Sequence, residues 1–111
     1  YAVTQLFYDN QTFFRFLEKA RAAGITMPII PGIKPLTKRS QLMVVPKTFH
    51  VDIPKELADE AARLTTDEQI AQLGIEWSTE QCRQLIDAGI DNIHFYTLTA
   101  SDSVGKIMKN L

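Results

Sequence analysis

Residues 2–8 read Ala-Val-Thr-Gln-Leu-Phe-Tyr and are followed at once by Asp9 and Asn10. A run of apolar and β-branched residues is typical of a β-strand, and Asp or Asn can cap the helix that follows. That helix is predicted to reach Gly24, because its apolar residues recur at helical spacing: Phe13, Phe16, Leu17 and Ala20.

The same order of strand and helix returns further along the chain. Residues 27–33, MPIIPGI, predict a short buried strand that the Pro31-Gly32 pair should end. Thr37 is then expected to cap a helix that Pro46 ends.

The second half of the chain is mostly helical in pattern. Pro54 suits the first turn of a helix. Thr66 and Gln69 match a capping box, from which a longer helix should run to Ala88 with a weak interruption at Gly74. The residues of this longer helix expected to face inward are Ile75, Cys82 and Ile86.

A third strand is predicted over residues 92–98, NIHFYTL, which alternate in polarity. Ser101 or Asp102 should cap the last helix. Its apolar stripe consists of Val104, Ile107, Met108 and Leu111.

The alternation of strands and helices decides the fold class. It favours a parallel sheet with right-handed crossovers, so residues 1–111 are predicted to be one α/β unit. Three strands are few for an independent domain, and the first and third resemble central strands rather than guarded edges. The chain also opens on Tyr1 without an initiator Met. We therefore expect it to be part of a longer protein.

Composition argues against several classes of function. The chain has 111 residues and a net charge of -1, which gives no electrostatic basis for binding nucleic acid or an anionic membrane surface. No apolar run approaches the roughly 20 residues that a membrane span needs, and a cytoplasmic location is expected.

Lys34, Lys38 and Arg39 are interpreted as solvated, with an anionic ligand as the alternative. Cys82 is predicted to be a small buried residue rather than a catalytic thiol.

Polar residues within the predicted strands are the candidates for function. No P-loop, complete GxGxxG, CxxC pair or HExxH is present, and His50 and His94 are not spaced as ligands of one metal. Parallel α/β folds bind ligands at the C-terminal ends of their strands, where Gln5, Tyr96 and the Pro-Gly-Ile turn should meet. The Gln5 amide could instead bond a neighbouring backbone group, and position alone does not decide between the two.

Three segments, VTQLFYD, IIPGIKPL and IHFYTL, occur in this order. Together with the Ile53-Pro54 pair they resemble methylenetetrahydrofolate reductase, whose sequences typically read ITQ-F-FD, IIPGI-P and HFYTLN at very similar spacing. The resemblance extends from Val3 to about Leu98. It implies a TIM (β/α)8 barrel, of which this chain supplies strands six, seven and eight with their helices.

The resemblance implies a flavoprotein oxidoreductase of one-carbon metabolism. In that family FAD takes hydride from NAD(P)H and passes it to 5,10-methylenetetrahydrofolate, which gives the 5-methyltetrahydrofolate used in methionine biosynthesis. The implied partners are a folate and a nicotinamide nucleotide, with no nucleic acid and no membrane. The choice between NADH and NADPH stays open, as does the oligomeric state, with a homo-oligomer among the candidates.

The resemblance also assigns substrate-binding residues. Gln5 matches a glutamine that hydrogen-bonds the pterin, because an amide offers a donor and an acceptor side by side. Gln41 matches a second glutamine that contacts substrate, with a solvated helix residue as the alternative. Tyr96 matches a position lining the substrate site, and Leu98 would pack beside the ligand.

Three positions depart from the family pattern. Val45 stands where many members carry an aromatic residue that stacks on the ligand. Ala100 stands where many carry a basic residue near the folate tail, and Thr99 where Asn is usual. These departures weaken the expectation of ordinary folate affinity.

The family's catalytic acid, a glutamate at the end of the first barrel strand, lies upstream of this chain. So do most residues that hold FAD, and neither Asp9 nor Asp52 matches those roles. The resemblance therefore assigns no catalytic residue here. The isolated chain is predicted neither to retain FAD nor to turn over.

Two other functions stay open. A non-enzymatic α/β interaction module would seal Val3, Phe7 and Tyr96 under its own helices, whereas a barrel segment would leave them open or bury them in an oligomer. A phosphate-binding barrel enzyme would need a Gly-rich loop leading into a short helix after strand seven or eight. Only Pro31-Gly32 is present.

Overall fold

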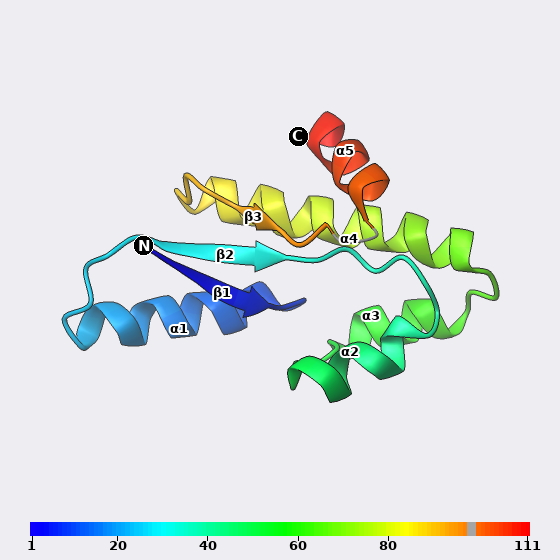
Figure 1. Ribbon diagram of the computed structural model, residues 1–111, viewed down its shortest axis with the longest axis horizontal. Coiled ribbons are helices and arrows are strands. Elements are labelled where there is room, and N and C mark those ends of the chain that lie inside the picture. Colours follow the sequence, from blue (N-terminus) through cyan, green and yellow to red (C-terminus); the bar gives the residue numbers. More distant parts are fainter. Residues whose placement is uncertain (98–99) are drawn as a thin grey trace.

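The computed structural model describes residues 1–97 and 100–111 of the chain. Its strands, β1 (Ala2–Leu6), β2 (Ile29–Ile33) and β3 (His94–Phe95), form one parallel sheet with β2 in the middle. Figure 1 shows the strands running in the same direction, so that their C-terminal ends lie toward the same edge. The predicted α/β class and parallel strand direction are confirmed.

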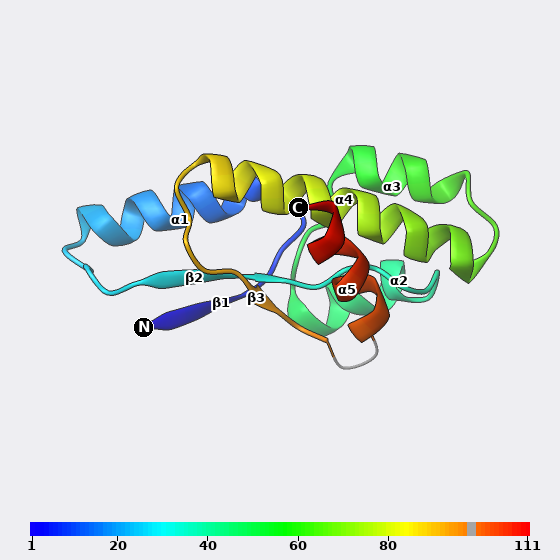
Figure 2. The ribbon, with the colours of Figure 1, turned by 90° about the horizontal axis from the view of Figure 1, so that it is seen from above.

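Helices fill the rest of the described chain: α1 (Asn10–Ala22), α2 (Gln41–Phe49), α3 (Lys55–Ala62), α4 (Asp67–Asp87) and α5 (Ser101–Asn110). Figure 2 shows α1 and α4 on the same side of the sheet. Phe13 and Ala20 of α1 and Cys82 and Leu85 of α4 are buried in the apolar core that these helices form with the strands. Phe16, on the predicted apolar stripe of α1, is 52% exposed.

Local signals set several helix ends as predicted. The Asp9 side chain accepts a main-chain N–H of the first turn of α1, and Thr66 and Gln69 form both bonds of a capping box at the start of α4. Gly24 and Gly89 follow α1 and α4 with φ of 88° and 90°. Glycine enters this left-handed region without the steric cost that a Cβ would bring, which is why it ends helices so often.

The prediction that Pro31-Gly32 ends the second strand was wrong, because β2 runs through both residues. Proline has no N–H to contribute to a ladder, yet here it lies opposite an irregularity of β1. Pairing joins Val3 to Ile30 and Leu6 to Gly32, so two residues of β1 face Pro31 alone. A bulge of this kind is one of the few places where a sheet accommodates proline.

The helix α2 begins and ends later than predicted. Thr37 does not cap it, because its hydroxyl instead accepts a bond from the Gln41 side chain at 2.9 Å, and Ser40 precedes the helix. Pro46 lies inside α2 rather than ending it. Proline removes one main-chain bond of the helix, and Val45, the residue before it, is buried in the interior.

The third strand is shorter than the predicted range 92–98. Since β3 can pair only where β2 still runs, it ends at Phe95, the partner of the last residue of β2. The following helix has Ala100, not Ser101 or Asp102, as its N-cap. Ala100 is buried, so α5 begins at a residue that packs in the protein interior.

Three further residues predicted to face inward are exposed: Ile86 by 48%, Met108 by 63% and Leu111 by 50%. On α4 the buried stripe passes through Cys82 and Leu85, which turns the adjacent Ile86 toward solvent. The other predicted inward residues are buried: Ile75, Cys82, Val104 and Ile107.

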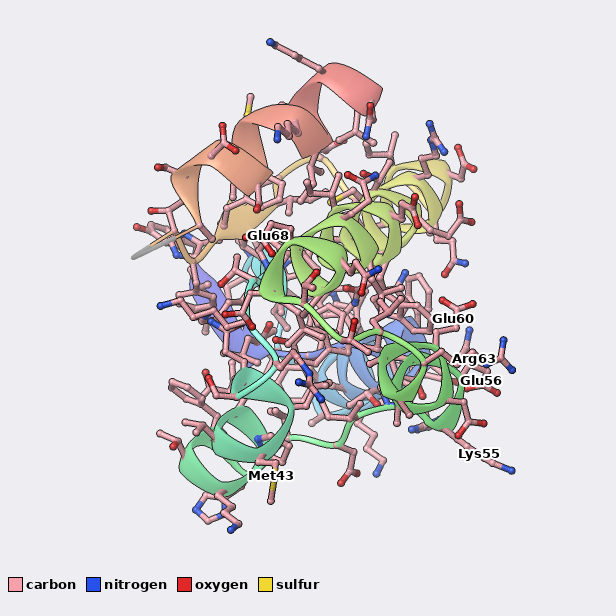
Figure 3. All side chains as sticks on the ribbon, turned by 90° about the vertical axis from the view of Figure 1, so that its right-hand side faces the viewer. Met43, Lys55, Glu56, Glu60, Arg63 and Glu68 are labelled. Atoms are coloured by element: carbon pink, nitrogen blue, oxygen red, sulfur yellow. The ribbon has the colours of Figure 1, made fainter. Side chains whose placement is uncertain are left out.

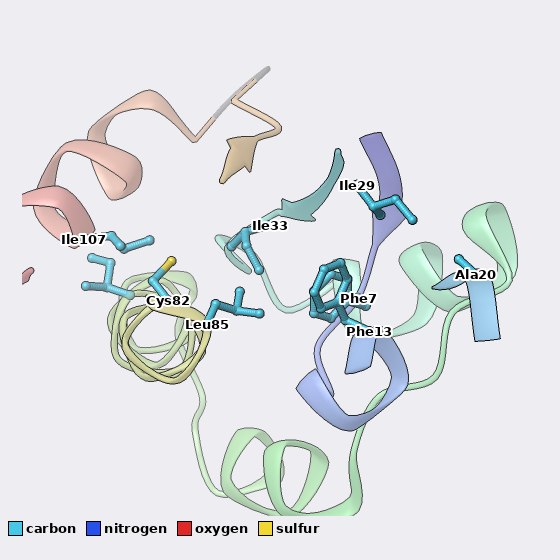
Figure 4. Close-up of a cluster of buried hydrophobic side chains, with 9 residues drawn as sticks. Phe7, Phe13, Ala20, Ile29, Ile33, Cys82, Leu85 and Ile107 are labelled. Carbon is cyan, nitrogen blue, oxygen red and sulfur yellow. The ribbon is translucent and has the colours of Figure 1, made fainter. Parts of the chain in front are cut away.

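Two apolar clusters stabilise the fold. The first, the sheet core, lies between the strands and the helices α1, α4 and α5, and Figure 4 shows it. It consists of Phe7, Phe13, Ala20, Ile29, Ile33, Ile75, Cys82, Leu85 and Ile107. The second, the helical core, joins the end of β1 to α2, α3 and α4. It consists of Leu6, Tyr8, Leu36, Val45, Leu57, Ala61, Ile70 and Leu73.

The outer face of α3 is polar. Figure 3 shows charged side chains along α3 that project outward, and these are Lys55, Glu56, Glu60 and Arg63. Leu57 of the same helix is buried in the helical core. Within the described ranges, no helix combines the length and the apolar character needed to cross a membrane.

Candidate functional site

One threonine ties together the C-terminal ends of the strands. Thr4 in β1 accepts the Gly32 N–H of β2 through Oγ1 at 3.0 Å, and its hydroxyl donates to the Gln5 carbonyl at 2.9 Å. The Thr4 carbonyl accepts a bond from the Tyr96 hydroxyl at 2.7 Å. Tyr96 directly follows β3, and its own N–H bonds to the end of β2. We call Thr4, Gly32 and Tyr96 the tip cluster.

Gly32 makes the close approach within the tip cluster feasible. A Cβ built on Gly32 would lie 2.6 Å from Tyr96 Cε2 and 2.7 Å from the Thr4 carbonyl oxygen. The Tyr96 ring therefore crosses β2 at a position where only a hydrogen fits. The His94 ring packs edge-on against the Tyr96 ring with 4.7 Å between centroids.

Gln5 is exposed beside the tip cluster. Its Oε1 accepts the Leu6 N–H at 3.1 Å, so the alternative of a bond to neighbouring backbone is realised at the amide oxygen. The amide nitrogen makes no hydrogen bond to any residue that the structure describes. An exposed amide in this state still offers two N–H donors and one oxygen lone pair to a ligand.

An open cleft of about 550 Å³ runs along β1 between α1 and the segment that follows α2. Gln5 lies in its wall together with Phe49. Its carboxylate and imidazole side chains are those of Asp9, His50 and Asp52, and the described lining contains no Lys or Arg. Since Asp9 already caps α1, the cleft suits an uncharged planar group better than an anion.

Gln41, the second predicted glutamine, uses its amide within its own loop. Its Oε1 accepts the Thr37 N–H at 2.8 Å, and its Nε2 donates to Thr37 Oγ1 at 2.9 Å. The side chain is half-buried at the start of α2. A ligand would have to compete with these two bonds, so the assignment of Gln41 to substrate binding stays a prediction.

The remaining predicted positions lie elsewhere. Leu98 and Thr99 fall outside the described residues. Val45, at the family's aromatic position, is 3% exposed and packs in the helical core. Ala100, at the family's basic position, is 2% exposed. In this structure neither Val45 nor Ala100 presents a side chain to solvent.

The three cations after β2 differ in burial. Lys34 is half-buried, and burial lowers the pKa of its ammonium group. Arg39 is exposed and donates to the Thr65 carbonyl at 3.3 Å, while its main-chain N–H bonds to Asp67. The interpretation of these residues as solvated therefore holds for Lys38 and Arg39, and only in part for Lys34.

Sequence reasoning missed the role of α4 in holding the segment after β1. Trp77 donates from Nε1 to the Tyr8 carbonyl at 2.8 Å, and Gln81 donates to the Phe7 carbonyl at 3.1 Å. The Asn10 amide donates in turn to the Gln81 carbonyl at 3.0 Å. The available signal was Trp77 and Gln81 among the apolar residues of the predicted helix, because buried polar groups need partners. Thr4 was missed as well.

Comparisons with known proteins identify relatives along the whole chain. The family model described as methylenetetrahydrofolate reductase matches residues 1–111. Methylenetetrahydrofolate reductase 1 of Schizosaccharomyces pombe is 37% identical and the probable methylenetetrahydrofolate reductase (NADPH) of Caenorhabditis elegans 35% identical, each over 100% of this chain. The 5,10-methylenetetrahydrofolate reductase of Escherichia coli is 31% identical over 91%. The chain spans 19%, 17% and 34% of these relatives' lengths.

A solved structure has a similar fold. It is an uncharacterized protein from Clostridium thermocellum that binds two copies of 5-methyl-5,6,7,8-tetrahydrofolic acid. The two superpose with a TM-score of 0.55 over 97% of this chain and 40% of the other, at 18% sequence identity. The match of the family model over residues 1–111 and the named relatives show that the chain belongs to the methylenetetrahydrofolate reductase family.

Proposed function

We propose that this chain supplies part of the folate-binding site of an enzyme that reduces 5,10-methylenetetrahydrofolate to 5-methyltetrahydrofolate with NAD(P)H through FAD. One observation carries the proposal: the exposed Gln5 amide lies beside the tip cluster, where the ends of the parallel strands converge. Ligands of parallel α/β folds bind at this edge. The folate-binding Clostridium thermocellum protein, with its similar fold, supports the choice of ligand.

The proposed role of Gln5 follows from the chemistry of a pterin. A pterin ring presents a donor and an acceptor side by side on one edge, and a primary amide is complementary to that pair. Gln5 is exposed, and its amide oxygen keeps one lone pair after bonding Leu6. Gln5 would therefore orient the folate, and a redox cofactor would supply the hydride.

We propose further that the three strands are strands six, seven and eight of a (β/α)8 barrel. Two exposures support this arrangement over a self-contained module. Val3 of β1 is 38% exposed and Tyr96 is half-buried, although Phe7 is sealed in the sheet core. In a complete barrel, further strands would pair with the outer edges of β1 and β3 and cover Val3.

The described residues do not fit FAD by themselves. A dinucleotide pyrophosphate needs cations or helix N-terminal N–H groups around it. The cleft beside Gln5 instead contains Asp9 and Asp52 and no described Lys or Arg. FAD would therefore be held by residues outside this chain, and the isolated chain would neither retain flavin nor catalyse the reaction.

The test combines a flavin spectrum with an activity assay on the full-length protein that carries residues 1–111. We expect flavin absorbance near stoichiometric amounts and NAD(P)H oxidation that depends on 5,10-methylenetetrahydrofolate. The isolated chain, purified in the same way, should carry no flavin. Full-length protein that binds flavin but ignores the folate would contradict the proposed reaction. Stoichiometric flavin on the isolated chain would contradict the division of roles.

A further inference from the structure

Thr4 has hydrogen bonds that a regular strand residue would not make. In a parallel ladder a main-chain carbonyl normally accepts the neighbouring N–H. Here the Gly32 N–H is accepted by the Thr4 hydroxyl oxygen at 3.0 Å. The same hydroxyl donates its proton to the Gln5 carbonyl at 2.9 Å. One side chain therefore joins β1 to the neighbouring strand and also bonds the carbonyl of the next residue.

These two bonds coincide with the bulge of β1. Thr4 and Gln5 are the two residues that face Pro31 alone, between the paired positions Val3 and Leu6. An extra residue in a strand reverses the faces of the residues that follow. Gln5 is thus the residue at which β1 changes face, and the direction of its side chain depends on the bulge.

Tyr96 fixes the other polar group of the same residue. Its hydroxyl donates to the Thr4 carbonyl at 2.7 Å, across a Gly32 position that has no room for a Cβ. The hydroxyl and carbonyl of Thr4 are therefore bonded to β2 and to the end of β3. The conformation before Gln5 is held from both strands.

We infer that Thr4 is a positioning residue for substrate: its hydroxyl maintains the bulge that presents the Gln5 amide to the folate, and the Tyr96 hydroxyl holds Thr4 in place. This inference rests on the proposed function, and it assigns Thr4 no contact with the ligand. It also gives the Tyr96 hydroxyl a partner within the protein. The contribution of Tyr96 to binding is then the placement of Thr4 together with its ring surface.

The test compares Thr4→Val with Thr4→Ser in the full-length protein. Valine has nearly the shape of threonine but neither accepts nor donates a hydrogen bond, whereas serine keeps the hydroxyl. The matched control is Thr48→Val, at an exposed threonine of α2. The readouts are the Kd for 5-methyltetrahydrofolate by calorimetry and the KM values for methylenetetrahydrofolate and for NAD(P)H. Circular dichroism melting shows whether each variant folds.

We expect Thr4→Val to raise the folate Kd and KM by about tenfold, the equivalent of one hydrogen bond. Thr4→Ser should stay within about threefold of the unmodified protein, because one hydroxyl restores both bonds. The KM for NAD(P)H should not follow the folate KM. If Thr4→Val does not fold, Tyr96→Phe provides the second variant, with a smaller rise expected in the folate Kd alone.

Three outcomes would overturn the inference. Folate binding unchanged in Thr4→Val would show that Gln5 is placed without the hydroxyl. Weakening by Thr4→Ser as large as that by Thr4→Val would show that the hydroxyl is not sufficient to place Gln5. Equal rises in the folate and NAD(P)H KM values would indicate general damage. Failure of the unmodified, folded protein to bind folate at all would instead refute the proposed function on which the inference rests.

Discussion

The Tyr96 hydroxyl donates a 2.7 Å hydrogen bond to the main-chain carbonyl of Thr4, although the two residues are 92 positions apart in the sequence. The tyrosine ring reaches β1 by passing over Gly32 in the middle strand. Thr4, Gly32 and Tyr96 belong to the three sequence segments that resemble the reductase family. In the tip cluster these residues hold the C-terminal ends of the three strands together.

Gly32→Ala should destabilise the fold and disturb the tip cluster. The new methyl group would meet the Tyr96 ring and the Thr4 carbonyl inside normal contact distance. Overpacking of this kind costs roughly 1–3 kcal/mol. Urea denaturation monitored by circular dichroism measures the loss. The matched control is Gly105→Ala in α5, where nothing lies within 4 Å of the added Cβ. That control should stabilise by about 0.5–1 kcal/mol, and equal losses in both variants would contradict the packing described.

Tyr96→Phe should lower the free energy of unfolding by about 1 kcal/mol, because it removes one hydrogen bond and keeps the ring. Tyr1→Phe is the control, since Tyr1 is 85% exposed and its hydroxyl should contribute little to stability. Urea midpoints of the two variants provide the comparison. Indistinguishable midpoints would mean that the bond between Tyr96 and Thr4 contributes nothing in solution.

Gly74→Ala should be more disruptive than Gly105→Ala, although both replace a helical glycine. A Cβ at Gly74 would collide with the main chain of Leu36, which cannot rotate away as a side chain can. The helix α4 runs uninterrupted through Gly74, so the residue serves close packing and not a break. We expect a fall in melting temperature for Gly74→Ala and a rise for Gly105→Ala. A rise for both would contradict the close approach of α4 to Leu36.

Stability should fall at alkaline pH through Cys82. Burial raises the pKa of the thiol from its ordinary value of 9.0 to about 11. Above pH 9 the unfolded chain loses this proton while the folded chain keeps it, so the free energy of unfolding decreases as pH rises toward about 11. Burial also raises the pKa of the Tyr8 hydroxyl above its ordinary 10.0, which adds to the fall above pH 10.

Denaturation of the Cys82→Ala variant at several pH values isolates the thiol contribution. At neutral pH the variant should be less stable because it leaves a small cavity. Between pH 9 and 10, however, its stability should change less with pH than that of the unmodified protein. The comparison concerns slopes, so the cavity does not interfere. Parallel slopes in this window would contradict the burial of the Cys82 thiol.

Local signals in the sequence were sufficient for several helix ends. Thr66 and Gln69 form a capping box from residues three apart, and Asp9 caps α1 from the adjacent position. Such contacts depend on neighbours in the sequence, so their pattern is readable there. The parallel sheet followed from the alternation of strand and helix, which constrains topology strongly.

Features set by distant contacts could not be predicted in the same way. In the sequence, Pro31 predicts the end of a strand. Its position within β2 is possible because the partner strand β1 has a bulge opposite it. The two hydrogen bonds between Gln41 and Thr37 depend on a turn of the main chain. The periodicity of apolar residues gives no sign of that turn. Thr4 looked like an ordinary β-branched strand residue, because its bonds to Gly32 and Tyr96 join segments far apart in sequence.

The central claim is that the Gln5 amide orients the folate, and Gln5→Leu in the full-length protein tests it directly. The reductive and oxidative half-reactions are followed separately at the flavin by stopped-flow absorbance, with Gln11→Leu at an exposed residue of α1 as the control. We predict that Gln5→Leu weakens methylenetetrahydrofolate binding in the oxidative half-reaction by about tenfold or more. Flavin reduction by NAD(P)H should stay near its original rate. Equal loss in both half-reactions, or none in the oxidative one, would contradict the claim.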